Sequence, residues 1–223
     1  MNRRRPSTLR VTKPRSLGPP QTPVFINCPF DSEFLPLFDS IVFAAVACGF
    51  TPRSAVETGT VSDSRIERIC NAMFSSRYSI DDLSRCKGEG DSNLARFNMP
   101  LELGFAMSRR FLAKAVWDSH DWLVLLPEGH EYTKFISDLG AYDAKTHRRT
   151  AGTIIPPVVN WLRTRPDAPL APFPDAVIKR LPAFQKELER LRTKSGGELP
   201  WSDTILTARK HAKNLSKRIP SEG

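Results

Sequence analysis

The sequence lacks any long hydrophobic segment. Its longest apolar run, IVFAAVAC at residues 41–48, is far shorter than the roughly 20 residues that a membrane-spanning helix needs. Residues 1–22 are rich in arginine but lack the apolar core of a secretory signal peptide. We therefore expect a cytoplasmic protein that does not enter a membrane, and we expect its four cysteines to be reduced thiols.

Several motifs that define common enzyme classes are also missing. The chain has no GxGxxG and no GxxxxGKS/T, which argues against a dinucleotide fingerprint and a P-loop. It has no GxSxG, which argues against an α/β-hydrolase. Its four histidines and four cysteines show no metal-ligand spacing. We therefore expect neither a metal site nor a bound cofactor.

The positive charge is concentrated at the two ends of the chain. The formal net charge is +9, and residues 1–20 hold six basic residues and no acid. From Lys179 onward there are eleven basic and five acidic residues, so the central part is mildly acidic. We interpret residues 1–22, which are also rich in proline, as a disordered basic tail. Such a tail could contact nucleic acid weakly and without sequence preference.

Strand-like and helix-like segments alternate through the central part. The hydrophobic patterns predict strands at 24–28, 50–57, 78–84 and 122–127, and helices at 31–48, 62–74 and 98–111. This alternation predicts an α/β fold of the flavodoxin or Rossmann type, with a parallel sheet covered by helices on both faces.

In the remaining chain, the pattern of apolar residues predicts further helices at 153–164, 175–194 and 201–216. A proline-rich stretch, RPDAPLAPFPDA, separates the first of them from the other two. We therefore divide the chain into the tail at 1–22, an α/β domain at 23–165 and a helical extension at 166–223. This extension could be a subdomain, a lid or a packing cover.

Polar residues lie at the carboxyl ends of three of the predicted strands. They lie at Asn27–Asp31, Arg53–Glu57 and Asp81–Arg85. Ligands of parallel sheets bind at the carboxyl ends of the strands, so these segments are candidates for a site. Because strand side chains alternate between faces, only one of Asp81 and Asp82 can point into such a crevice. Arg53 could hold a phosphate group or be a surface charge.

Glu102 has two interpretations. It lies near the start of a predicted helix, where a carboxylate stabilises the helix dipole. A reciprocal capping arrangement would need Ser or Thr at position 99, which is Met99. The apolar neighbours of Glu102 favour a raised pKa of the kind found in catalytic acids. Glu102 is therefore either an ordinary helix-start glutamate or a residue aimed at a ligand.

Three segments together resemble a known superfamily. VFINCPFD, IDDLS and NMPLELGFA look like the nucleoside 2-deoxyribosyltransferase and Toll/interleukin-1 receptor (TIR)-like superfamily, in which a strand-end Asp-x-Ser precedes an N-x-x-x-E-L-G helix. They also resemble an uncharacterised bacterial group with FINCPFD and RFNMPLELG motifs. The likeness covers roughly residues 24–126. One departure is Asn98-Met99-Pro100, which replaces the glycine-threonine turn of many deoxyribosyltransferases.

The resemblance implies roles for individual residues. Glu102 would be the catalytic carboxylate at the anomeric carbon, and Asp82 would bind ribose hydroxyls or assist the leaving base. We expect the two carboxyl groups to share one cavity, so that a single sugar touches both. The expected substrate-binding residues are Asn27, Pro29, Phe30, Asp31, Arg53, Ser84, Asn98 and Met99.

The resemblance implies an N-glycosidase that cleaves the ribosyl–base bond of NAD or a related nucleotide. By analogy, it also implies a bacterial anti-phage effector that self-associates as a homo-oligomer. NAD or the nucleotide would be the substrate, and no cofactor is required. Three alternatives stay open: a non-catalytic nucleotide-sensing module, a nucleoside 2-deoxyribosyltransferase, and an interaction protein that acts through its basic ends.

Overall fold

The computed structural model describes residues 22–57, 64–86, 97–113, 119–134, 136–168, 171–213 and 215. All but the last residue of the tail expected at 1–22 therefore lies outside the described residues. Within the described part, no helix is both long enough and apolar enough to cross a membrane.

A parallel sheet of five strands forms the centre of the molecule. The strands are β1 (Pro23–Asn27), β2 (Thr51–Ser54), β3 (Tyr78–Asp82), β4 (Asp121–Pro127) and β5 (Lys145–His147). Their order is β2-β1-β3-β4-β5, and every neighbouring pair is parallel. This arrangement confirms the α/β fold class predicted from the sequence.

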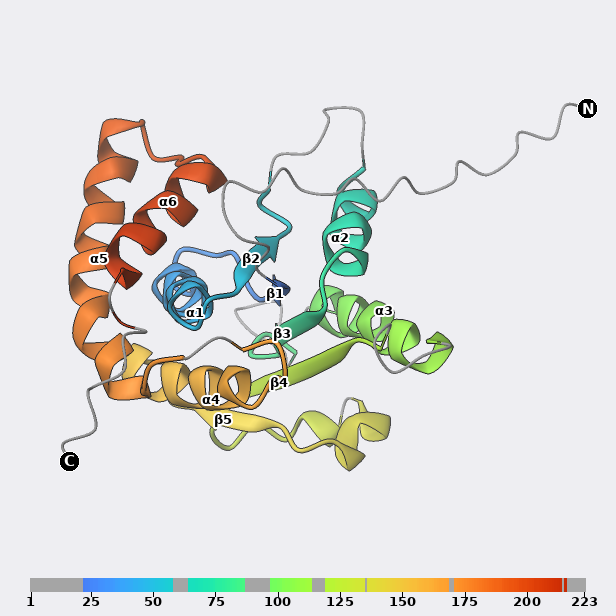
Figure 1. Cartoon of the computed structure of the whole chain (residues 1–223). Coiled ribbons are helices and arrows are strands. Elements are labelled where there is room, and N and C mark those ends of the chain that lie inside the picture. The colour runs from blue at the N-terminus through green and yellow to red at the C-terminus, as the bar shows by residue number, and fades with distance from the viewer. Residues whose placement is uncertain are drawn as a thin grey trace, which may run out of the picture.

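Helices cover both faces of the sheet (Figure 1). One layer holds α1 (Leu35–Ala47), α4 (Ala151–Arg163), α5 (Pro174–Lys194) and α6 (Trp201–Ala212). The other holds α2 (Arg65–Phe74) and α3 (Asn98–Leu112). Two 3₁₀ helices, η2 (Tyr132–Lys134) and η3 (Ser137–Ala141), precede β5.

The element boundaries differ from the expectation at a few places. Helix α1 begins at Leu35 rather than at 31, because Asp31 forms a turn in which its backbone and side-chain oxygens accept hydrogen bonds from the Phe34 N–H. Strand β5 was not predicted, since its three residues, KTH, carry no apolar pattern. Helix α4 runs through Pro156 and Pro157, and its buried aliphatic face offsets the missing backbone hydrogen bonds.

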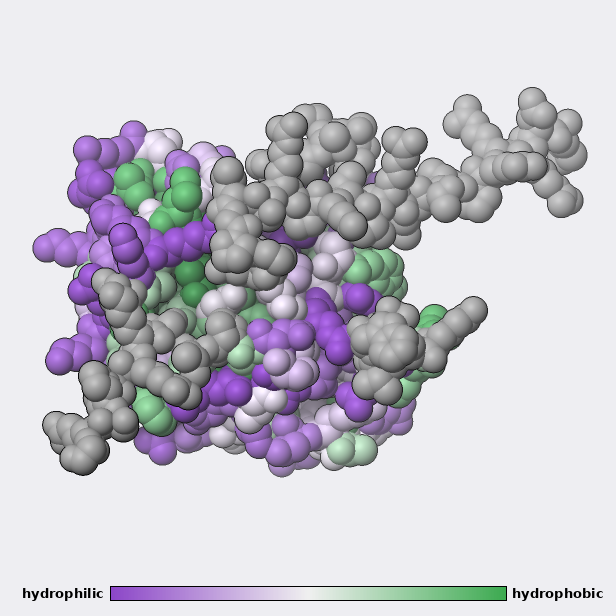
Figure 2. Space-filling view, viewed as in Figure 1, coloured by the Kyte–Doolittle hydropathy of each residue, from purple (hydrophilic) through white to green (hydrophobic). Residues whose placement is uncertain are grey.

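The largest core cluster lies on the α1 side of the sheet. It joins alternate residues of β1, β3 and β4 to α1, α4, α5 and α6. The rings of Phe43 and Phe184 stack with their centroids 4.8 Å apart, and both are fully buried. Helices α5 and α6 therefore pack against α1, while the outer surface of α5 is polar, as the purple region on the left of Figure 2 shows.

A buried ion pair also fixes α5 to α1. Arg192 donates two hydrogen bonds of 2.7 Å to the carboxylate of Asp39, which is only 2% exposed. Burial raises the pKa of Asp39, and the hydrogen bonds from Arg192 oppose that rise. Such a pair is a weak source of net stability, but losing one member leaves a buried charge without a partner.

Replacing Arg192 should therefore destabilise the fold strongly. We expect Arg192→Met to lower the free energy of unfolding by about 3 kcal/mol, measured by urea denaturation at pH 7. The double variant Asp39→Leu/Arg192→Met should recover most of this loss, because no charge is left buried. Arg190→Met, on the exposed side of the same helix, is the control and should change the value by less than about 0.5 kcal/mol. If Arg192→Met and Arg190→Met lowered the free energy of unfolding by the same amount, the prediction would be contradicted.

Candidate functional site

The candidate site lies at the carboxyl ends of β1 and β3. After β1 the chain continues through α1 to β2, and after β3 it continues through α3, on the other face, to β4. Because β2 and β4 lie on opposite sides of the β1–β3 pair, the strand order reverses between these two strands. Open parallel sheets bind ligands at such a point. Asn27 and Asp81 are paired in the register here, and both side chains face the α2/α3 layer.

The amide of Asn27 connects three elements at this point. Its Nδ2 donates to Asp81 Oδ1 on β3 at 2.9 Å and to the backbone carbonyl of Met99 on α3 at 3.0 Å. Ser79 donates its hydroxyl proton to the other carboxylate oxygen of Asp81 at 2.6 Å. Asn27 and Asp81 are both almost fully buried, so these contacts fix the start of α3 against the ends of β1 and β3.

Glu102 lies on the buried face of α3. The buried residues of this helix are Met99, Glu102, Leu103 and Ala106, which have the three- and four-residue spacing of one helix face. Glu102 is 5% exposed and makes no hydrogen bond or ion pair within the described part of the chain. A buried carboxylate without a hydrogen-bonding partner costs free energy, so a purely structural role does not account for it.

Two cavities adjoin Glu102. The larger has a volume of about 290 Å³ and is lined by Asn27, Cys28, Pro29, Phe30, Asp31, Arg65, Asn98, Met99 and Glu102. The smaller, of about 190 Å³, is lined by Arg65, Ile66, Ile69, Asn98, Leu101 and Glu102. Three residues are common to both: Arg65, Asn98 and Glu102. Glu102 thus lines two neighbouring cavities between the strand ends and the first turns of α2 and α3.

The surroundings raise the pKa of both carboxyl groups. Burial is the main reason that the pKa of Glu102 rises to about 7; the Arg65 guanidinium opposes this rise and the Asp81 carboxylate adds to it. Burial also raises the pKa of Asp81 to about 6, against the effect of its hydrogen bonds from Ser79 and Asn27. Glu102 therefore changes charge near neutral pH, which suits a group that must accept or stabilise charge during a reaction.

The structure does not bring Asp82 to Glu102. Asp82 faces the α1/α4 layer, because its neighbour Asp81 takes the α2/α3 face and strand side chains alternate. Its Oδ2 lies 2.9 Å from His147 Nε2, and its Oδ1 accepts the Ser84 N–H at 2.8 Å. The expectation that a single sugar touches both Glu102 and Asp82 is thus wrong, and Asp81 is the aspartate on the face of Glu102.

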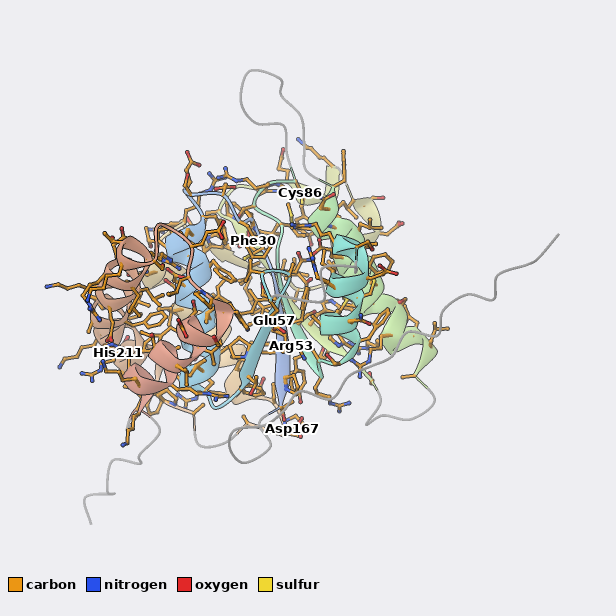
Figure 3. The ribbon with its side chains drawn as sticks, turned by 90° about the horizontal axis from the view of Figure 1, so that it is seen from above. Phe30, Arg53, Glu57, Cys86, Asp167 and His211 are labelled. Atoms are coloured by element: carbon orange, nitrogen blue, oxygen red, sulfur yellow. The ribbon has the colours of Figure 1, made fainter. Side chains whose placement is uncertain are left out.

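Six of the eight expected substrate-binding residues line the larger cavity: Asn27, Pro29, Phe30, Asp31, Asn98 and Met99. Ser84 does not line this cavity; its Oγ lies 3.5 Å from His147 Nε2. Arg53 does not line it either, and its Nε donates to the Glu57 carboxylate at 2.7 Å and 2.8 Å. Figure 3 shows Arg53 next to Glu57, with Phe30 further toward the end of the molecule where Cys86 is labelled.

The sequence interpretation missed Arg65 altogether. It is the first residue of α2, directly after Ser64, whose hydroxyl caps the helix in a reciprocal arrangement with Glu67. The capping pattern places Arg65 at a helix start at the carboxyl side of the sheet, which is a signal that the sequence does contain. Its position opposite Glu102 depends on how α2 packs against α3, which the pattern does not give.

No protein-family model, no curated protein and no solved structure matches the chain. Across the described residues, no cluster of three or more His, Cys, Asp or Glu side chains is placed to hold a metal ion.

The raised pKa of Glu102 predicts a pH-dependent stability difference. Its pKa is about 7 in the folded protein against an ordinary value of 4.5, so the folded state holds this proton more tightly and loses stability as pH rises from about 4.5 to above 7. Glu102→Gln removes that loss. Its free energy of unfolding, minus that of the wild type, should increase by about 2 kcal/mol between pH 5 and pH 8. Urea denaturation at both pH values tests this, and a difference that does not change with pH would contradict it.

Proposed function

We propose that the protein is an N-glycosidase that cleaves the bond between ribose and base in NAD or a related nucleotide, with Glu102 as the catalytic carboxylate. The observation that carries the proposal is a buried carboxylate, free of hydrogen bonds, that faces a cavity at the switch point of the sheet. Cleavage of an N-glycosidic bond builds positive charge on the sugar. A carboxylate beside the anomeric carbon stabilises that charge or forms an ester with the sugar.

The other carboxyl groups of the site are poorly placed to protonate a leaving base, which favours a substrate whose base leaves without gaining a proton. Both oxygens of Asp81 already accept hydrogen bonds, from Asn27 and Ser79. Both oxygens of Asp31 accept hydrogen bonds from Arg85. Neither group is therefore well placed to give a proton to a purine or pyrimidine nitrogen. A pyridinium base such as nicotinamide needs no such proton.

The reaction balances with water as the only second reactant. The bond between the anomeric carbon and the pyridinium nitrogen breaks, and its electron pair neutralises the nitrogen as nicotinamide leaves. The sugar cation is held by the Glu102 carboxylate until a water oxygen bonds to the anomeric carbon. The proton lost by that water passes to solvent. The positive charge of the bound substrate also lowers the pKa of Glu102 and so favours its ionised form.

Glu102→Gln should abolish cleavage while keeping the fold. We expect the rate of nicotinamide release from NAD to fall by about 10³-fold or more, because the variant has no negative charge to offer the transition state. Release is followed by chromatography with mass detection, alongside nicotinamide mononucleotide and a panel of purine and pyrimidine nucleotides. Glu128→Gln, an exposed residue that pairs with Arg148, is the control and should keep full activity. Undiminished turnover in Glu102→Gln would end the assignment.

The direction of the pH profile distinguishes the roles open to Glu102. If the ionised carboxylate stabilises the sugar, kcat/KM should rise about tenfold per pH unit below about 7 and level off above it. A general acid would give the opposite slope, since it acts in the protonated form. A profile that falls through pH 7 would therefore contradict the carboxylate role proposed here.

A further inference from the structure

Two polar side chains line the cavities beside Glu102, and the charge of one of them, Arg65, acts on its carboxyl group. Arg65 begins α2 and Asn98 begins α3, and both are exposed at the two cavities that also include Glu102. Within the described residues, neither side chain makes a hydrogen bond or an ion pair. The cavities are thus lined by a guanidinium and a carboxamide together with a buried carboxylate.

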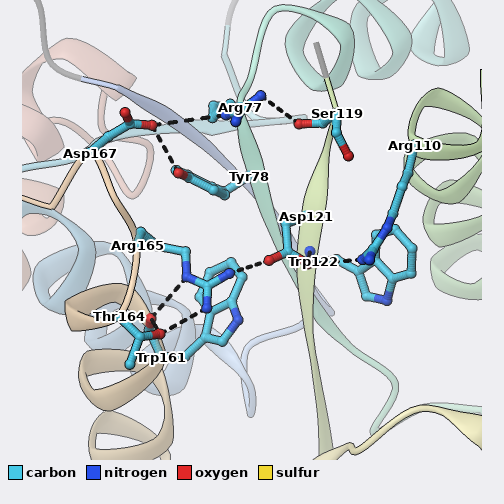
Figure 4. A network of polar contacts seen from close by, with 10 residues as sticks. All are labelled: Arg77, Tyr78, Arg110, Ser119, Asp121, Trp122, Trp161, Thr164, Arg165 and Asp167. Atoms are coloured by element: carbon cyan, nitrogen blue, oxygen red, sulfur yellow. Dashed lines mark hydrogen bonds and ion pairs between the residues drawn. The ribbon is translucent and has the colours of Figure 1, made fainter. Parts of the chain in front are cut away.

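Several other arginines of the described structure are bound to acidic or aromatic side chains within the fold. Arg53, Arg85 and Arg192 pair with Glu57, Asp31 and Asp39 respectively. At the amino end of β4, Arg110 lies over Trp122, and Arg165 lies over Trp161 and also pairs with Asp121 (Figure 4). These guanidinium groups are already bound within the fold. Arg65, by contrast, has its donors available at a cavity.

We infer, resting on the function proposed above, that Arg65 and Asn98 bind a phosphate group on the ribose whose bond to the base is cleaved. A guanidinium matches two phosphate oxygens with parallel N–H donors, and a carboxamide N–H adds a further donor. The two residues line both cavities together with Glu102, so a sugar placed over that carboxylate can direct a charged substituent towards them. The inferred substrate is therefore a nucleotide, which carries this phosphate, rather than a nucleoside, which does not.

The positions of the charged residues at the cavities also favour a phosphate beside Arg65. An anion placed against Glu102 on α3 or Asp81 on β3 would be repelled. Arg65 lies on the α2 side and is the one basic residue that lines either cavity within the described part of the chain. A ligand with a cationic or neutral sugar centre and an anionic substituent therefore has one favourable orientation in these cavities.

Binding to inactive protein tests the inference. Nicotinamide riboside and nicotinamide mononucleotide differ only in the 5′-phosphate, and isothermal titration of both is carried out on full-length Glu102→Gln. We expect the phosphorylated ligand to bind at least about 10-fold more tightly, as charge-assisted hydrogen bonds predict. Adding Arg65→Gln should remove that preference while leaving the affinity for the riboside within about twofold. Asn98→Asp, which is nearly isosteric, should also reduce it.

Arg110→Gln in the same background is the matched control, because it removes one exposed positive charge from the far end of α3. It should keep the preference for the phosphorylated ligand, and thermal unfolding checks that every variant is folded. Equal affinities for the two ligands, a preference that survives Arg65→Gln, or no binding of either ligand would each overturn the inference. The proposed function fails separately, if wild-type protein releases no base from any nucleotide in the panel.

Discussion

The site depends on one side chain, the amide of Asn27. Its two hydrogen bonds tie the end of β1 to Asp81 on β3 and to the Met99 carbonyl at the start of α3. All three residues are buried, so losing either bond would leave a buried polar group without its partner. The position of Glu102 follows from this connection, since it lies one helical turn beyond Met99 on the same face of α3. Asn27 thus acts as a positioning residue.

The buried acids of the described residues fall into two groups. Asp39 is matched by Arg192, Asp81 by Asn27 and Ser79, and Asp82 by His147 and the Ser84 backbone. Glu102 has no such match, and burial raises its pKa to about 7. A buried and unmatched carboxylate costs free energy, whereas a substrate with a developing positive charge would compensate it. This carboxylate lies on α3, where it lines both cavities.

The two helical layers contribute differently to the molecule. The α1 layer holds the largest core cluster, with the stacked rings of Phe43 and Phe184 and the pair of Asp39 and Arg192. The α2/α3 layer contributes smaller clusters and the lining of the smaller cavity, and it lines the larger cavity together with the segment Asn27–Asp31. Helices α5 and α6 pack on α1 and do not line either cavity in the described structure. Stability is therefore concentrated on one face and the candidate chemistry on the other.

The sequence by itself determined the alternation of strands and helices and the set of polar segments at the strand ends. It did so because hydrophobic periodicity and caps such as Ser64 are local properties. It also placed Glu102 in the first turns of a helix. Only the tertiary structure decided that Asp81, rather than Asp82, shares the face of Glu102, because strand pairing fixes which face each side chain takes. The same holds for Arg53, which turns to Glu57, and for Arg65, which reaches the cavity through the packing of α2 against α3. The partners of a side chain are set by contacts between segments far apart in the chain, and no local pattern records them.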